Sequence, residues 1–353
     1  MPLLARMVAS PLTVDVRRGA ITGLRRLLAE GGISAGGRVA VLVGAGQGEA
    51  IAEVLAPTLK DADVLPVQSA SVDGARDLAV QLRQSSYDAV VGIGGGRTLD
   101  VAKYTASLTG LPMVAVATNL SHDGIASPVA SLEHEGRKGS YGVPVPLAVF
   151  VDLDYVERAP ARMVRSGVGD VVSNLSALSD WRLAADERGE QFDGLAAAMA
   201  RASADAVIYR PDSIESADFL TTLAEALVLS GLAMSVAGSS RPCSGGDHEI
   251  VHAIDQLFPG TGNHGELAGL GALFCARLRE DGAQVAAIER CLRRHELPCT
   301  HSDVGLTAEQ FTEAVLAAPH TRPDRYTILE HLDLGRDEIL ERVAEADRAL
   351  LAE

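Results

Sequence analysis

DAVVGIGGGRTLDVAK, residues 88–103, is an apolar run that ends in three consecutive glycines and continues as an amphipathic pattern. The apolar run predicts a buried strand, and the pattern after the glycines predicts a helix on which Asp100 and Lys103 can pair. The glycines allow a tight turn and would let a phosphate approach the backbone N–H groups of a helix N-terminus. Spacing alone favours neither explanation of the three glycines.

Similar strand patterns lie on both sides of this stretch. Apolar runs at 38–44, 63–69, 88–96 and 112–118 alternate with amphipathic helical patterns over roughly the first 150 residues. Strand and helix in alternation predict a parallel sheet with crossover helices, whose ligands bind beyond the carboxyl ends of the strands. A second glycine cluster, Gly44 to Gly48, follows the first of these runs. Glu49 stands where a dinucleotide fingerprint has its third glycine, so this signal is weak.

The remaining residues have a helical texture. Long Ala, Leu, Arg and Glu stretches such as 173–190 and 220–238 contain few β-branched runs, and Pro160 interrupts the pattern that precedes them. We therefore expect an α/β domain over residues 1–158 and an all-helical domain over residues 159–353, with the boundary near Glu157 to Ala159.

Composition excludes several classes of function. Lys+Arg 31 against Asp+Glu 47 gives a net charge of −16 with no basic run, which disfavours binding to nucleic acid. The four cysteines form no C-x-x-C pair, as is typical of a reducing compartment. No signal peptide is evident, and the weakly polar run from Ala226 to Gly238 is too short to span a bilayer. We expect a cytoplasmic protein without a membrane partner.

Polar side chains gather in two further places. The loop ATNLSHDGIASP, residues 117–128, follows a predicted strand, so it either contacts a ligand or caps a helix start through Ser121 or Asp123. HEIVH, residues 248–252, matches the H-E-x-x-H pattern of zinc peptidases, in which Glu249 would act on a metal-bound water. The longer metzincin pattern fails, because Asp255 and Phe258 stand where it needs glycine and histidine.

Two isolated residues are ambiguous. Asp170 follows a Gly-Val-Gly at the predicted start of an apolar helix, where a carboxylate caps a helix or ligates a metal. His264 lies among small residues in GTGNHGELAGLG, where a lone histidine is more often structural than a ligand.

Six separated stretches, in this order, resemble the sn-glycerol-1-phosphate dehydrogenases of the superfamily that holds the iron-containing alcohol dehydrogenases, glycerol dehydrogenase and dehydroquinate synthase. They are GIGGGRTLDVAK (92–103), SHDGIASP (121–128), GVGDVVSNLSALSDWRLA (167–184), SSRPCSGGDHEIVHAID (239–255), GNHGELAGLG (262–271) and APHTRPDRYTILEHL (318–332). Ala117, where proline is expected, and the unusual segment 257–262 depart from the family pattern. The resemblance implies a dehydroquinate synthase-like fold and dependence on NAD or NADP and on a metal.

The resemblance also implies roles for particular residues. Asp170, His248 and His264 would bind Zn²⁺ or another divalent metal, Asp170 would also contact substrate, and HEIVH would be a coincidental match to the peptidase pattern. Asp123 and His252 would contact the substrate and serve in catalysis. The residues implied to bind the cofactor are Gly94, Gly95, Gly96, Arg97, Thr98, Thr118, Ser121 and Ser127.

The expected reaction is reduction of dihydroxyacetone phosphate to sn-glycerol 1-phosphate, or of a closely related phosphorylated ketone, in phospholipid metabolism. Such a substrate needs local cations, for which we nominate Lys138 and Arg241, with Arg137 and Arg325 as alternatives. A dehydroquinate-synthase-like cyclase and, more remotely, an HExxH peptidase or a non-catalytic binding protein are the other interpretations. We expect a homo-oligomer.

Overall fold

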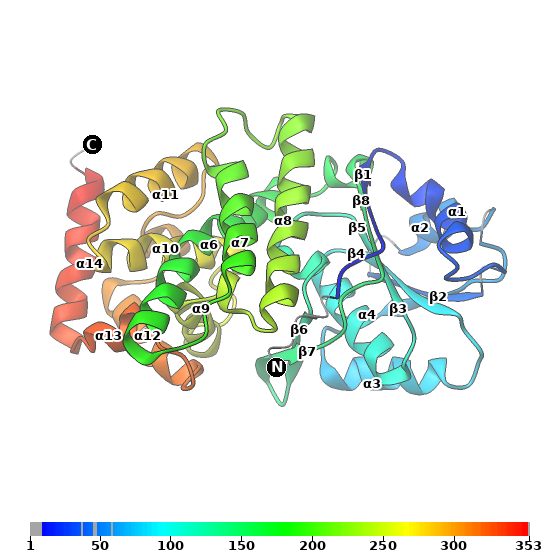
Figure 1. The fold of residues 1–353 in the computed structure, drawn as a ribbon, viewed down its shortest axis with the longest axis horizontal. Coiled ribbons are helices and arrows are strands. Elements are labelled where there is room, and N and C mark those ends of the chain that lie inside the picture. The colour runs from blue at the N-terminus through cyan, green and yellow to red at the C-terminus, as the bar shows by residue number, and fades with distance from the viewer. Residues whose placement is uncertain (1–8, 37, 45–47, 58, 352–353) are drawn as a thin grey trace, which may run out of the picture. The chain divides into compact units, whose positions relative to one another are not determined.

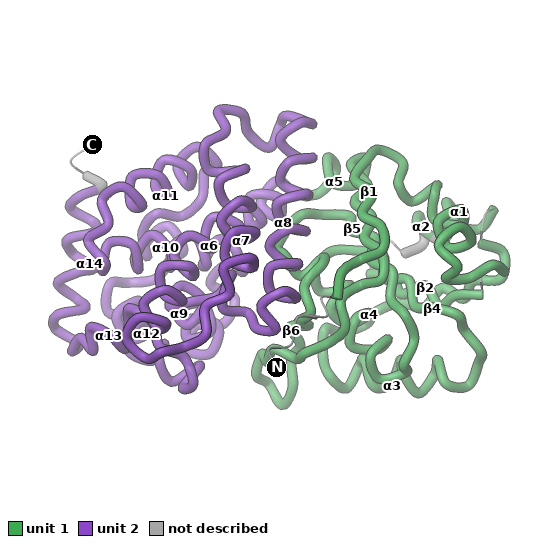
Figure 2. The backbone as a smooth tube through the Cα atoms, viewed as in Figure 1, with its two compact units in different colours: residues 1–159 green, residues 160–353 purple. Residues whose placement is uncertain are grey.

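The computed structural model describes residues 9–36, 38–44, 48–57 and 59–351. The chain forms two compact units, Met1–Ala159 and Pro160–Glu353, which Figure 2 shows in green and purple. Each unit has its own hydrophobic core, one around a sheet and one among helices.

The first unit is built on a six-stranded parallel sheet in the order β1-β8-β5-β4-β2-β3. Its strands are β1 (Thr13–Arg17), β2 (Val39–Gly44), β3 (Asp63–Val67), β4 (Ala89–Gly94), β5 (Met113–Ala117) and β8 (Ala148–Asp152). The four strands predicted from apolar runs are confirmed as β2, β3, β4 and β5. Strands β4, β5 and β8 are buried along their whole length, as is usual where helices cover both faces of a parallel sheet.

Helices connect the strands and follow the expected alternation. They are η1 (Ala20–Gly23), α1 (Leu24–Glu30), α2 (Gly48–Leu55), α3 (Val72–Leu82), α4 (Gly96–Thr109), η2 (Asp123–Ile125) and α5 (Leu153–Val156). The strand order reverses between β2 and β4, so the carboxyl ends of these two strands flank the place where ligands bind in open α/β sheets. The glycine-rich turn after β4 lies at that edge, as predicted.

An antiparallel hairpin, β6 (Val129–His134) with β7 (Arg137–Gly142), also belongs to the first unit and was not predicted. Lys138, nominated from the sequence as a phosphate-binding cation, is an exposed residue of β7 that faces Glu133 across the hairpin. Gly136 at the tip has a φ of +74°, which glycine adopts without strain.

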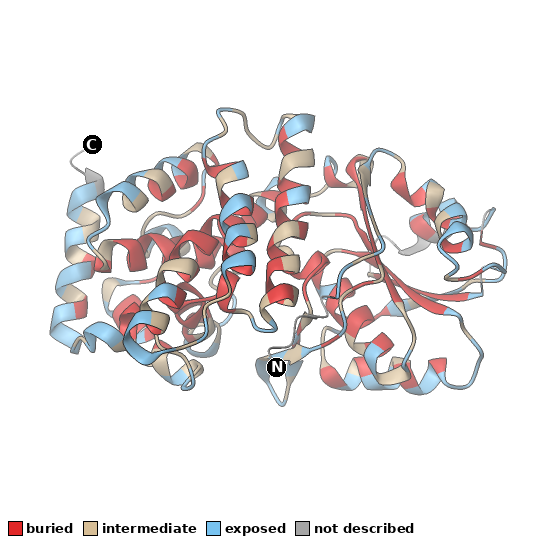
Figure 3. Cartoon of the chain, in the orientation of Figure 1, coloured by how far each residue is buried: buried red, intermediate tan, exposed pale blue. Residues whose placement is uncertain are grey.

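All regular secondary structure among the described residues of the second unit is helical, and Figure 1 shows these helices from green to red. They are α6 (Ala161–Arg188), α7 (Gly194–Ile208), α8 (Ala217–Ala237), η3 (Arg241–Cys243), α9 (Gly246–Leu257), α10 (His264–Leu278), α11 (Gly282–Arg294), η4 (Ser302–Val304), α12 (Ala308–Thr321), α13 (Ile328–Leu332) and α14 (Arg336–Leu351). Figure 3 shows α10 buried along almost its entire length.

Helix α8 is long and apolar enough to cross a membrane by length and composition, with a mean hydropathy of 1.7 over its apolar window. However, 67% of that window is buried inside the protein, where α8 packs against α7, α6 and η3. Its position in the core therefore accounts for the apolar composition of α8. A single helix of this kind is weak evidence for a membrane span.

Candidate metal centre and cofactor turn

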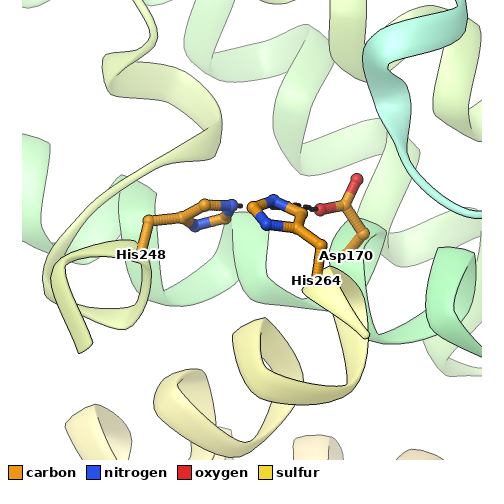
Figure 4. A group of neighbouring side chains, drawn as sticks. All are labelled: Asp170, His248 and His264. Atoms are coloured by element: carbon orange, nitrogen blue, oxygen red, sulfur yellow. Dashed lines mark ion pairs between the residues drawn. The ribbon is translucent and has the colours of Figure 1, made fainter. Parts of the chain in front are cut away.

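Asp170, His248 and His264 come together within the second unit, on three different helices (Figure 4). One potential ligand atom from each lies within 4.8 Å of the other two. Asp170 Oδ1 is 3.9 Å from Nε2 of His248 and 3.5 Å from Nε2 of His264. Two imidazoles and one carboxylate suit a divalent zinc or iron ion and leave coordination positions open for a substrate. The residues present therefore fit a catalytic metal.

A close crossing of α6 and α10 places Asp170 beside His264. A Cβ on Gly265 would lie 1.8 Å from the carbonyl oxygen of Ser166, and one on Gly169 would lie 2.1 Å from that of Gly265. The hydroxyl oxygen of Ser166 also accepts a hydrogen bond of 3.1 Å from the N–H of Gly265. Only residues without a side chain allow two helix backbones to approach this closely.

This crossing corrects the sequence interpretation of Asp170. The residue lies in the interior of α6, well past the first turn, so it is not a helix cap. Gly169, which looked like part of a flexible segment before a helix, is a helical residue at the contact with α10. The sequence could not reveal this, because a glycine that permits a helix contact and one that permits a turn look alike.

Asp247 orients the imidazole of His248. Its carboxylate is fully buried, and its Oδ2 pairs with Nδ1 of His248 while its Oδ1 accepts from the N–H of Gly245. A carboxylate on one ring nitrogen directs the other nitrogen toward a metal and increases its basicity. A Cβ on Gly271 of α10 would lie 2.7 Å from the carbonyl oxygen of Asp247, so α9 and α10 are also held at close range. Sequence analysis missed Asp247.

His264 is the first residue of α10, whose N-terminus is fixed from two directions. Asn263 and Glu266 form a capping box, and Glu266 also binds the guanidinium of Arg162 through contacts of 2.6 and 2.7 Å. His264, a candidate metal ligand, therefore lies at a helix end that is tied to α6.

The five residues of HEIVH lie on helix α9, as predicted, but they do not form a peptidase site. Glu249 is 1% exposed and accepts a hydrogen bond of 3.1 Å from Thr327. Burial, with Glu330 and Asp180 nearby, raises the pKa of Glu249 to about 9, so at neutral pH it is protonated and is not a base. His252 lies 3.0 Å, through Nε2, from the guanidinium of Arg322 and is not part of the three-residue ligand group.

In the first unit the glycine-rich turn connects β4 to α4. Thr98 packs between the ends of two strands, since a Cβ on Gly44 or on Gly94 would lie 2.7 Å from its hydroxyl oxygen. The turn is equally crowded on its other side, where a Cβ on Gly95 would meet Asn119 and one on Gly96 would lie 1.9 Å from Nε2 of His122. These glycines leave no space for side chains, which suits the approach of a cofactor phosphate. Arg97 is exposed.

The 118–128 loop is attached to this turn. Thr118 donates to the carbonyl of Gly94 across 3.0 Å, and Lys103 donates to the carbonyl of Gly124 across 2.7 Å. The predicted pair of Lys103 with Asp100 is confirmed at 2.9 Å, with both side chains buried.

The polar residues of the loop do not cap a long helix. His122, not Ser121 or Asp123, caps the short η2 helix by accepting from the N–H of Gly124 across 3.0 Å. Ser121 and Asp123 are partly exposed, whereas Thr118 and Ser127 are buried. The other glycine cluster, 44–48, lies largely outside the described residues.

The nominated phosphate-binding cation of the second unit is already paired. Arg241 is 5% exposed, and its guanidinium binds the carboxylate of Glu190 and the carbonyl of Tyr326. It belongs to the short η3 helix. Because Glu190 offsets its charge, the structure argues against Arg241 as a phosphate ligand.

Comparisons with known proteins define the class to which this fold and site belong. Residues 15–160 match the family model for iron-containing alcohol dehydrogenase. The crystal structure of a probable glycerol dehydrogenase from Sinorhizobium meliloti aligns over 98% of both chains with a TM-score of 0.80 and 25% identity. The predicted architecture, a parallel-sheet domain followed by helices, is therefore that of the iron-containing alcohol and glycerol dehydrogenases.

Proteins of similar sequence indicate one family within this class. A glycerol-1-phosphate dehydrogenase [NAD(P)+] from Archaeoglobus fulgidus is 40% identical over 80% of this chain and 83% of its own. Another from Thermofilum pendens is 38% identical over 92% of this chain and 94% of its own. The chain belongs to the glycerol-1-phosphate dehydrogenase family and is an NAD(P)-linked oxidoreductase, as the resemblance implied.

Proposed function

We propose that this enzyme uses a bound zinc ion and NADH or NADPH to reduce dihydroxyacetone phosphate to sn-glycerol 1-phosphate. The observation that carries this proposal is the group of Asp170, His248 and His264, with ligand atoms within 4.8 Å of one another. The names of the sequence relatives support the substrate. We place the reaction in the cytoplasm, with homo-oligomeric enzyme acting on a small phosphorylated ketone.

The ligand group would hold the metal, whose chemistry when bound is Lewis-acid polarisation of the substrate carbonyl ahead of hydride transfer. His248 is held in place for this by Asp247, and His264 by the capped start of α10. We assign Gly94 to Thr98, with Thr118, Ser121 and Ser127, to the cofactor. We assign Asp123 and His252 to substrate orientation, and His252 also to proton supply, because imidazole titrates near neutral pH.

The test is turnover by metal-loaded protein. Zinc-reconstituted enzyme is mixed with dihydroxyacetone phosphate and NADH or NADPH, absorbance is followed, and the configuration of the product is determined. We expect oxidation of one of the cofactors and the sn-1 product, with Asp170→Ala and His264→Ala losing both metal and turnover. His252→Ala should keep its metal while turnover falls.

Two results would contradict the proposal. If metal-loaded wild type oxidises neither cofactor, the substrate assignment is wrong. If cofactor is required but shows no net turnover, the cyclase reaction replaces the reduction. Unchanged turnover in metal-saturated His252→Ala would remove that residue from proton supply.

A further inference from the structure

Three arginines lie close together in the second unit, in and near the stretch APHTRPDRYTILEHL, which the proposed metal and cofactor sites leave unused. Arg322 and Arg241 both lie near enough to Arg325 for their positive charges to lower its pKa. Burial, with these neighbours, lowers the pKa of Arg325 to about 10. Burial also lowers the pKa of Arg322. Three arginines therefore lie near one another, with Glu249 and Asp247 close to Arg325, in a chain whose net charge is −16.

The three arginines differ in what their guanidinium groups contact. Arg241 binds the carboxylate of Glu190, which offsets its charge. Arg325 donates to two neutral oxygens, the carbonyl of Ser244 and the hydroxyl of Ser240, so its hydrogen bonds hold the connection between η3 and α9. Arg322 instead reaches His252, with Nη2 3.0 Å from Nε2. The contact of Arg322 is thus with a residue assigned to the substrate.

The local chain fixes Arg322 in this position. It is the C-cap of α12, and Pro323 directly after it cannot continue the helix. Helix α12 packs against α9, the helix that carries both His248 and His252. A guanidinium has only donors, so Nε2 of His252 accepts in this contact and a neutral ring carries its proton on Nδ1.

The spacing along α9 matches the size of the substrate. His248 and His252 are four residues apart and share a helix face, so one turn of about 5.4 Å separates a metal ligand from the histidine that contacts Arg322. In a three-carbon phosphorylated ketone, one methylene and one ester oxygen separate the carbonyl carbon from phosphorus. A carbonyl at the metal and a phosphate near Arg322 therefore lie at compatible positions along α9.

We propose that Arg322 binds the phosphate of the substrate, one turn of α9 beyond the metal ligand His248, with His252 between the two positions. This inference rests on the proposed reduction of a phosphorylated ketone. Arg325 contributes positive potential, and the phosphate would receive paired, charge-assisted hydrogen bonds from the planar guanidinium of Arg322.

The test compares ligands with and without a phosphate. Zinc-loaded wild type, Arg322→Met and Arg322→Lys are titrated by calorimetry with sn-glycerol 1-phosphate, inorganic phosphate and glycerol. Kinetic constants are measured with dihydroxyacetone phosphate and dihydroxyacetone. Arg188→Met, an exposed arginine that stacks on Tyr326 at 4.3 Å, is the matched control. Zinc content and melting temperature report on folding.

We expect Arg322→Met to weaken binding of both phosphate-bearing ligands about 10- to 100-fold, as for loss of charge-assisted hydrogen bonds. KM should rise for the phosphorylated ketone far more than for dihydroxyacetone, and Arg322→Lys should recover part of the loss. Arg188→Met should bind all ligands as wild type does.

The outcomes separate this inference from the proposed function. If wild type reduces dihydroxyacetone phosphate but Arg322→Met binds sn-glycerol 1-phosphate normally, the inference is wrong and the function stands. Equal losses for phosphorylated and unphosphorylated ligands would also overturn it, because they indicate only a structural role. If wild type does not reduce this ketone yet binds inorganic phosphate through Arg322, the anion site stands and the substrate assignment fails.

Discussion

The glycine-rich turn of the first unit and the candidate metal centre of the second are constructed differently. Gly94 to Thr98 are consecutive residues between one strand and one helix, so their geometry follows from local backbone conformation. Asp170, His248 and His264 come from three helices, and they meet only because α6, α9 and α10 pack closely. The first site can therefore be recognised as a motif, whereas the second depends on how helices cross.

This difference predicts that metal binding depends on the close contacts between helix backbones as well as on the candidate ligands themselves. Gly265→Ala would place a methyl group 1.8 Å from the carbonyl of Ser166 and force α10 away from α6. We expect about 3 kcal/mol of lost unfolding free energy, together with loss of bound metal. Denaturant unfolding and metal analysis would measure both.

The matched control for that variant is Gly282→Ala, where an added Cβ has no atom within 4 Å. It should retain full metal content and stability. Metal content equal to wild type in Gly265→Ala would show that the close crossing is not needed to assemble the centre.

The next largest effect should come from Asp247, which holds the imidazole of the candidate ligand His248. Asp247→Asn keeps the size of the side chain but removes the charge that faces Nδ1 of His248. Metal affinity should fall about 10- to 100-fold. Competition with a metal chelator would measure the change, with Asp186→Asn, an exposed position on α6, as the control. Equal affinities in the two variants would mean that Asp247 does not orient the ligand.

A substitution in the glycine-rich turn, the proposed cofactor site, should affect cofactor binding and leave the metal unaffected. In Gly96→Ala the new Cβ would lie 1.9 Å from Nε2 of His122, so the 118–128 loop must shift. NADH affinity, measured by fluorescence titration, should fall about tenfold because of this crowding. Metal affinity should not change. Gly142→Ala, which has open space around it, is the control, and a Gly96→Ala protein with normal NADH affinity would contradict the assignment of this turn.

A pH experiment concerns His295, a buried histidine of the second unit that lies outside the candidate ligand group. His295 is 2% exposed, packs on Phe219 and has no hydrogen-bond partner for either ring nitrogen within the described part of the chain. Burial lowers the pKa of His295 from 6.5 to about 4. The unfolded chain therefore takes up a proton that the folded one excludes, so stability present above 6.5 is lost as pH falls toward 4.

Between about pH 7 and about pH 5.5 this histidine should reduce the free energy of unfolding by about 1 kcal/mol. Urea titrations of metal-free wild type and His295→Leu at the two pH values would show the difference. An identical loss of stability in both proteins would assign the acid sensitivity to other groups.

Sequence patterns predicted the sheet better than the site. Strands β2, β4 and β5 are continuous apolar runs bounded by small residues, a pattern that burial on both faces imposes locally. The β6–β7 hairpin was missed because half of its residues are exposed and polar, so it lacks such a run. Asp170 was placed at a helix start because Gly167 and Gly169 resemble a turn when the helix they contact is unknown.

The sequence by itself determined the alternation of strands β2 to β5 with helices, the glycine turn and, through resemblance, the residues of the candidate metal set. Only the tertiary structure decided that Asp247 supports His248, that Glu249 is buried against Thr327, and that Arg241 is paired with Glu190 while Arg322 reaches His252. The physical reason is the separation along the chain over which each kind of interaction acts. Propensity and burial patterns act over a few neighbouring residues, whereas hydrogen bonds and charge pairs join residues that the chain brings together from distant positions.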